Sequence, residues 1–154
     1  MQGIRQLTLL GGIITALLSA CARSPHSLAR RVSGLSVPGS ATVVRFVDEP
    51  AGMLAQDRST EVELTVSPSQ TKALANEAAR LGYERLVDTA GAVTKRVDPV
   101  NRAGISQHGW AEAAALLGPG AVGYLRYQRE SESSYSLALL DSTTNRLVIR
   151  VLIL

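Results

Sequence analysis

Cysteine, histidine and aromatic residues are scarce in this sequence, and each scarcity excludes a class of site. The chain has 154 residues, with 1 Cys and 2 His. A single cysteine excludes an intrachain disulfide and a multi-cysteine zinc site, and two histidines are too few for a self-contained metalloenzyme. Aromatic residues make up 4% of the chain, too few for the stacking platforms that bind nucleic acid. We therefore expect no metal, no cofactor and no nucleic-acid partner.

Apolar runs of membrane-spanning length are also missing. The stretches Leu7–Leu18 and Leu147–Leu154 both fall short of the roughly 20 helical residues that cross a hydrocarbon core. The hydrophobic content of 45% is nevertheless enough for the packed core of one ordinary domain.

Acidic residues are absent before Asp48, although the chain as a whole carries 16 basic and 13 acidic residues. The amino-terminal part is therefore basic and the remainder slightly acidic. No run of lysine or arginine accompanies this asymmetry, so it does not indicate nucleic-acid binding. We interpret the basic part as a solvated tether; weak attraction to anionic lipid is the alternative.

Residues 1–20 have the layout of a secretory signal peptide. A short polar region with Arg5 precedes the apolar stretch, and the small residues Ser19 and Ala20 follow it. A positive region, an apolar region and a small-residue cleavage site define such peptides. An uncleaved membrane anchor is the alternative, and the shortness of the apolar stretch argues against it.

The sequence Leu18-Ser19-Ala20-Cys21 resembles the lipobox of bacterial lipoproteins. The resemblance implies cleavage between Ala20 and Cys21, and a diacylglycerol group on the Cys21 thiol, which is the nucleophile of the motif. A cysteine buried at the end of a core helix is the alternative. In enterobacterial lipoproteins an aspartate after the cysteine favours the inner membrane. Ala22 stands there, so we expect the outer membrane with the domain facing the periplasm, and the outer leaflet of the inner membrane as the alternative.

Residues 21–40 are interpreted as the lipidated cysteine and a flexible tether. Serine, glycine, proline and arginine dominate residues 22–40, with no sustained period of 2 or 3.6. As a random coil this tether reaches on the order of 25 Å from the membrane. His26 is expected to be a solvated tether residue.

Residues 41–154 are predicted to form one α+β periplasmic domain. Ser67, Pro68 and Gln70 form a helix-start signal, which predicts a helix ending near Gly82. We expect a single mixed β-sheet with two helices mainly on one face and a C-terminal three-strand antiparallel meander. Apolar alternation and turn residues predict strands over 42–47, 61–66, 83–88, 121–128, 134–141 and 147–153, helices over 67–81 and 106–117, and loops over 48–60 and 89–105.

Part of the domain resembles the amino-terminal domain of the TolB family, the curli-secretion lipoproteins and the lipoprotein activators of penicillin-binding proteins. The resemblance covers 113–147. Leu117-Gly118 ends a helix, Gly123 lies inside a strand, and an alternating strand ends at Asp141 before a threonine-containing turn. It implies a fold layout and an envelope setting, and no particular activity.

No residues form a convincing catalytic set in the sequence, and we expect no enzyme. His108 is the only histidine of the domain; a hydrolase that uses it is an alternative, but no Gly-x-Ser-x-Gly element is present. The carboxylates of Glu61 and Glu63 are interpreted as solvated. Trp110 is a possible interaction residue, although its spacing with Leu117 favours core packing.

The C-terminal strand is expected to pair with 134–141 and to have two distinct sides. Leu147, Ile149, Val151 and Ile153 should be buried under the helices. Arg150 should emerge on the opposite side together with Val148 and Leu152, where we expect a partner-binding surface. The predicted function is that of a lipid-anchored, non-enzymatic interaction or assembly factor for an envelope, secretion or cell-wall complex. A lipoprotein that binds a small ligand or an envelope polymer is the alternative.

Overall fold

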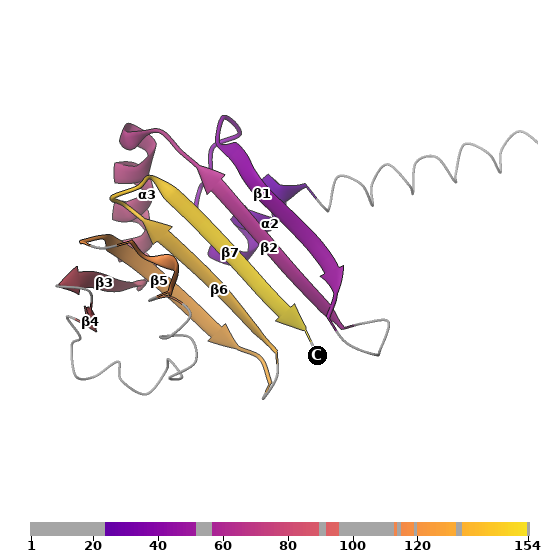
Figure 1. The fold of residues 1–154 in the computed structure, drawn as a ribbon. Helices are drawn as coiled ribbons and strands as arrows, with labels where there is room; N and C mark the ends of the chain where they lie inside the picture. Colours follow the sequence, from indigo (N-terminus) through magenta and orange to yellow (C-terminus); the bar gives the residue numbers. More distant parts are fainter. Residues whose placement is uncertain are drawn as a thin grey trace, which may run out of the picture.

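The computed structural model describes residues 24–51, 57–89, 92–95, 113, 115–118, 120–131 and 134–153. The described strands form one sheet in the order β1-β2-β7-β6-β5-β3-β4 (Figure 1). The predicted α+β class is therefore confirmed. The elements are α2 (Pro25–Ser33), β1 (Thr42–Pro50), β2 (Arg58–Thr65), α3 (Pro68–Arg80), β3 (Glu84–Thr89), β4 (Ala92–Lys95), β5 (Val122–Arg129), β6 (Tyr135–Asp141) and β7 (Arg146–Ile153).

All strand pairs of the described sheet are antiparallel, which corrects the expected mixed sheet. The pairings make β2 and β3, which flank α3 in the chain, run in the same direction, as a helical crossover requires. They do not become neighbours, because the meander β5-β6-β7 lies between them. The predicted C-terminal meander is thus confirmed, and its insertion explains why no parallel pair forms.

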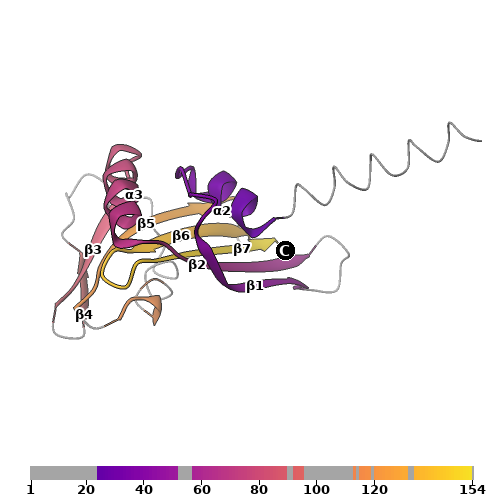
Figure 2. The ribbon, with the colours of Figure 1, turned by 90° about the horizontal axis from the view of Figure 1, so that it is seen from above.

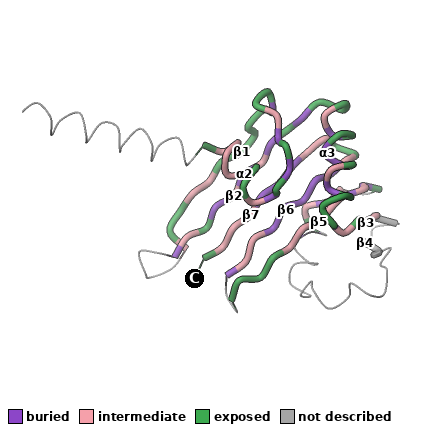
Figure 3. The backbone as a smooth tube through the Cα atoms, turned by 180° about the vertical axis from the view of Figure 1, so that it is seen from behind, coloured by how far each residue is buried: buried purple, intermediate pink, exposed green. Residues whose placement is uncertain are grey.

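The two helices α2 and α3 cover the same face of the sheet (Figure 2). The buried residues on this face form one core with both helices, which bury Ala29, Leu74 and Ala78 against it. Strand β7 contributes Leu147 and Ile149, which are both fully buried, as predicted. The prediction is wrong farther along the strand, where Val151 is only partly buried and Ile153 is 43% exposed, because the core under the helices does not reach the end of β7. Strand β1, at the edge of the sheet, is exposed over most of its length (Figure 3).

A second core lies on the opposite face of the sheet. It joins Leu86, Leu125, Leu137 and Leu139 from β3, β5 and β6 to Leu117 and its neighbours. Residues 113, 115 and 116 are helical, so the end of the helix predicted over 106–117 packs on the face that α2 and α3 leave open. The expectation that both predicted helices share one face is wrong for this segment. Leu137 and Leu139 point away from α2 and α3, and this segment buries them on the opposite face.

The segment expected to be a flexible tether is structured from Ser24 onward. Ser24 caps α2 by accepting a hydrogen bond from the Ser27 amide, and Gly34, with φ 70°, ends the helix. Ala29, Leu35 and Val37 are buried in the core under the helices. The tether prediction is therefore wrong for residues 24–40. His26 is half-buried rather than a freely solvated tether residue, and its Nε2 lies 2.8 Å from the Ala41 carbonyl oxygen.

Helix α3 follows its sequence signals closely. The Ser67 hydroxyl accepts a hydrogen bond from the Gln70 amide, and the Gln70 side chain accepts one from the Ser67 amide, which completes the predicted capping box. Gly82 after the helix has φ +76°, a left-handed conformation in which glycine carries no steric cost.

The predicted loops at 48–60 and 89–105 are partly strand. Strand β1 continues to Pro50, and β2 begins at Arg58, so the two form a longer hairpin than expected. Asp48 makes this extension possible, because its carboxylate accepts hydrogen bonds from the Arg58 guanidinium, at 2.9 Å for Nη2, and from the Thr60 hydroxyl at 3.0 Å. Strand β4 lies inside the second predicted loop and pairs with β3.

Candidate interaction surface

Four residues singled out in the sequence lie outside the described residues. They are Ala20, Cys21, His108 and Trp110. The structure therefore tests neither the cleavage and lipidation site nor the interaction role of Trp110. Arg150 is the one predicted site residue that the structure places.

Arg150 lies on the face of β7 that points away from α2 and α3, as predicted. In the sheet, β7 stands between β2 and β6, and Arg150 is directly opposite Glu61 of β2. Its Nε donates a hydrogen bond to Glu61 Oε2 over 3.1 Å. Val148 on the same side is buried, so this face offers charge at β7 rather than the apolar strip suggested by Val148 and Leu152.

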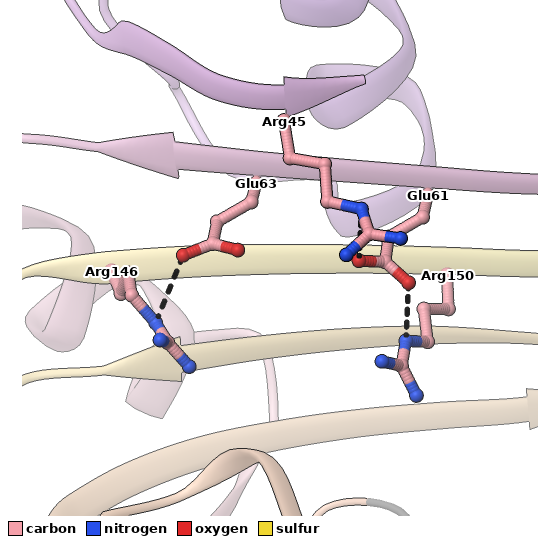
Figure 4. A network of polar contacts seen from close by, with 5 residues as sticks. All are labelled: Arg45, Glu61, Glu63, Arg146 and Arg150. Atoms are coloured by element: carbon pink, nitrogen blue, oxygen red, sulfur yellow. Dashed lines mark hydrogen bonds and ion pairs between the residues drawn. The ribbon is translucent and has the colours of Figure 1, made fainter. Parts of the chain in front are cut away.

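Glu61 is shared between two arginines from the strands on either side of it (Figure 4). Arg45 Nε of β1 lies 3.2 Å from Glu61 Oε1, and Arg150 Nε of β7 lies 3.1 Å from Glu61 Oε2. The Arg45 side chain is 59% exposed and that of Glu61 only 20%. The carboxylate is thus held below a rim of two guanidinium groups, of which Arg45 is the more accessible.

A second ion pair lies two residues farther along β2. Glu63 Oε1 is 3.4 Å from Arg146 Nε of β7, and Arg146 Nη2 also donates a hydrogen bond to the Leu116 carbonyl oxygen over 2.9 Å. Arg146 therefore joins the charged part of this face to the segment that covers the second core. We call the five side chains Arg45, Glu61, Glu63, Arg146 and Arg150 the charged face.

A depression of about 280 Å³ adjoins the charged face at the end of β7. Tyr135 of β6 stands on its border and stacks on Tyr127 of β5, with ring centroids 5.4 Å apart. An aromatic ring beside alternating charges is suited to the side chains of a protein partner, because arginine and tyrosine are enriched at interface hot spots. The lining residues are Ser59, Thr60, Glu61, Tyr135, Arg150, Val151 and Leu152.

Sequence reasoning identified Arg150 but not the residues that accompany it. Glu61 and Glu63 are not simply solvated, because each pairs with arginine from a neighbouring strand. The alternation of Glu61 and Glu63 with Val62 and Leu64 did indicate that the two acids share a face. Which arginines pair with them depends on the order of the strands in the sheet, and the sequence pattern does not indicate that order.

The described part of the chain contains neither a cluster of metal-binding side chains nor a helix that could cross a membrane. Its His, Cys, Asp and Glu side chains form no group of three that could hold a metal ion. None of its helices is long and apolar enough to span a membrane.

The comparisons with known proteins return no match. No protein-family model, curated protein or solved structure matches this chain. Its function is therefore argued from its own residues.

Proposed function

We propose that this chain is a lipid-anchored protein of the bacterial envelope that acts without catalysis, by binding an envelope protein through its charged face. The lipobox sequence ending at Cys21 supports the anchor, and Ala22 favours the outer membrane, with the inner membrane as the alternative. A charged face on the side of the sheet opposite α2 is the observation that carries the interaction role.

The arrangement of the charged face favours a protein partner. Glu61 and Glu63 are recessed, with 20% of each side chain exposed, while Arg45 and Arg150 expose 59% and 31%. A partner therefore meets guanidinium groups first, which favours an acidic surface. Rim charges of this kind steer association and fix register more than they add affinity.

Small-ligand binding has less support among the described residues. Three concavities that they line have volumes of about 170, 270 and 280 Å³. Sites for drug-sized ligands typically measure about 300–1,000 Å³ and are mostly apolar. A polymer of the envelope, which needs no deep pocket, remains the alternative partner.

Chemical crosslinking in intact cells, followed by pull-down, tests the interaction role. The wild-type chain is expected to capture one dominant envelope complex, and Arg150→Glu is expected to lose it. Arg80→Glu makes the same change of charge on α3, away from the charged face, and should retain the complex. Capture of no dominant complex by the wild type would contradict the proposed function. Equal capture by Arg150→Glu and Arg80→Glu would contradict the charged face as its site.

A further inference from the structure

The chain between Ser24 and Ala41 is fixed to the body of the domain by polar contacts as well as by its buried side chains. The Ser33 carbonyl oxygen accepts hydrogen bonds from Tyr83 Oη over 2.6 Å and from Arg126 Nη1 over 3.1 Å. Glu77 of α3 accepts two more, from the amide and the hydroxyl of Ser36, over 2.9 and 2.8 Å. Helix α2 therefore moves with the sheet as one body.

This attachment shortens the path from the lipidation site to the domain. Only Ala22 and Arg23 separate Cys21 from Ser24, the cap of α2, and a fully extended chain of that length spans at most about 11 Å. If Cys21 carries lipid, as the proposed function states, the body of the domain lies close to the lipid headgroups. It does not hang on a long tether.

Exposed apolar side chains gather near the amino-terminal turn of α2. The contact between His26 and the Ala41 carbonyl places this turn beside the start of β1. Among the described residues, the large apolar side chains that are exposed are Val43, Val44, Phe46, Leu81 and Ile153. The first three lie on β1, and Ile153 lines the same groove as Phe46.

That groove runs between α2 and β1 and has a volume of about 170 Å³. Leu28 and Arg31 of α2 line it together with Phe46, Asp48, Arg58, Thr60, Val151 and Ile153. Arg31 is exposed and has no acidic partner among the residues that the structure describes. Asp48 is neutralised by its hydrogen bonds to Arg58. The exposed acidic residue nearest to Arg31 in the sequence is Glu49, which lies farther along β1.

We propose that this surface, formed by Leu28, Arg31, Val43, Phe46 and Ile153, rests on a layer of anionic phospholipid headgroups. Apolar side chains beside basic ones are the composition by which peripheral segments enter the headgroup region, and anionic lipid attracts nearby arginine. The short connection to Cys21 holds the surface at the membrane. The charged face, on the other side of the sheet, stays available to a protein partner.

Spin labels on the lipidated full-length protein in vesicles test this orientation. Val43→Cys places a label on the proposed surface, because Val43 lies opposite Leu64 of the core under the helices. Leu81→Cys places one at a comparably exposed apolar position after α3. Cys21 does not react, because its thiol carries the lipid. In vesicles of phosphatidylethanolamine and phosphatidylglycerol, the label at 43 should collide with lipid-dissolved oxygen. The label at 81 should collide with a water-soluble relaxation agent.

The outcomes separate this inference from the proposed function. Mass spectrometry of the amino-terminal peptide first shows whether Cys21 carries lipid; without lipid, the proposed anchor fails and the orientation is not supported. With lipid present, equal water exposure of both labels would overturn the inference alone. Protection of the label at 43 from both agents would indicate a protein on this surface and would also overturn the inference.

The charge of Arg31 gives the second measurement. Arg31→Glu should reduce the lipid contact of the label at 43 by at least about five-fold, because one basic residue near an anionic surface contributes about that factor. In vesicles of phosphatidylcholine alone, the variant and the parent should behave alike. An equal effect of the substitution in both kinds of vesicle would overturn the role of anionic lipid.

Discussion

Tyr83 and Ser33 are 50 residues apart in the chain and share a buried hydrogen bond, in which the phenol donates to the Ser33 carbonyl oxygen over 2.6 Å. The bond closes the carboxyl end of α2 onto the sheet. Burial raises the pKa of Tyr83 to about 12, although the Arg126 guanidinium beside it acts in the opposite direction. The hydroxyl is therefore both a structural contact and a titrating group of the fold.

Stability should fall in alkaline solution because of Tyr83. The folded protein holds this proton up to about pH 12, while an unfolded tyrosine loses it near pH 10. The contribution of this proton to the free energy of unfolding is complete below pH 10. As the pH rises from 10 to 12, the free energy of unfolding falls by about 2–3 kcal/mol. Urea unfolding at a series of pH values measures it.

Tyr83→Phe is the matched control for this decline. The variant should be less stable at neutral pH by about 1 kcal/mol, because one hydrogen bond is lost, and its stability should fall less steeply between pH 10 and 12. Parallel curves for the two proteins would show that Tyr83 does not cause the alkaline loss.

Gly123 of β5 and Leu117 are expected to be energetically coupled. A Cβ atom at position 123 would lie 2.8 Å from Leu117 Cδ2 and 3.3 Å from Leu139 Cδ1. Gly123→Ala should therefore cost about 1–3 kcal/mol by overpacking the second core. In a Leu117→Ala background the same substitution should cost much less, and a double-mutant cycle from chemical denaturation measures the difference. If Gly123→Ala lowers the free energy of unfolding equally in both backgrounds, the backbone of β5 shifts to make room and the two residues are not coupled.

Strand β7 is expected to be indispensable for folding. Removal of residues 149–154 would delete Ile149, which is fully buried, and leave β2 and β6 with only the first three residues of their shared partner. Each large aliphatic side chain contributes about 1.5–3 kcal/mol, against a domain stability of about 5–15 kcal/mol. Calorimetry should show no cooperative unfolding. Cooperative melting near the full-length temperature would contradict the central position of β7.

Trypsin should spare α2 although it contains two cleavage sites. Arg30 and Arg31 are exposed, but a protease needs an extended backbone, and α2 is held by its contacts to Tyr83, Arg126 and Glu77. Mass spectrometry of the resistant fragment should find both arginines intact. Glu77→Ala removes the hydrogen bonds to Ser36 and should accelerate cleavage at Arg30 and Arg31. A wild-type resistant fragment that begins at Arg31 or Val32 would contradict a fixed α2 and support the flexible tether.

Cys21→Ser should abolish lipid attachment. A serine hydroxyl is a far weaker nucleophile than a cysteine thiolate, so the variant should take up no radiolabelled fatty acid. Undiminished labelling would contradict lipidation at Cys21.

Local signals predicted the elements that depend on neighbouring residues. Helix α3 follows from its capping box and Gly82, and the β6–β7 hairpin follows from alternation and from Asn145, which adopts φ 59°. Helix α2 had comparable signals: Ser24 and Pro25 at its start, Gly34 at its end, and Leu28, Val32 and Leu35 at helical spacing. Helix α2 was nevertheless interpreted as a tether, because serine and arginine are frequent in it and most of its exposed surface is polar.

The rest depended on which strands become neighbours. The pairing of Glu61 with Arg150 joins residues 89 positions apart, and no local pattern encodes such a distance. The same holds for the second core, since Leu137 and Leu139 indicate a buried side of β6 without indicating what covers it. The charged face was therefore predictable only at Arg150.

The place of β7 in the sheet also determines the order in which the domain can be completed. The β1–β2 hairpin forms early in the chain, but the only strand that joins it to the rest of the described sheet comes after all the others. Contacts between such distant segments close slowly, because a long loop must first be ordered. Until then, β2 has an open edge that alternates Val62 and Leu64 with charged residues, and open edges invite pairing with other chains. The arrival of β7 therefore ends both the folding reaction and the period in which the chain is most prone to aggregate.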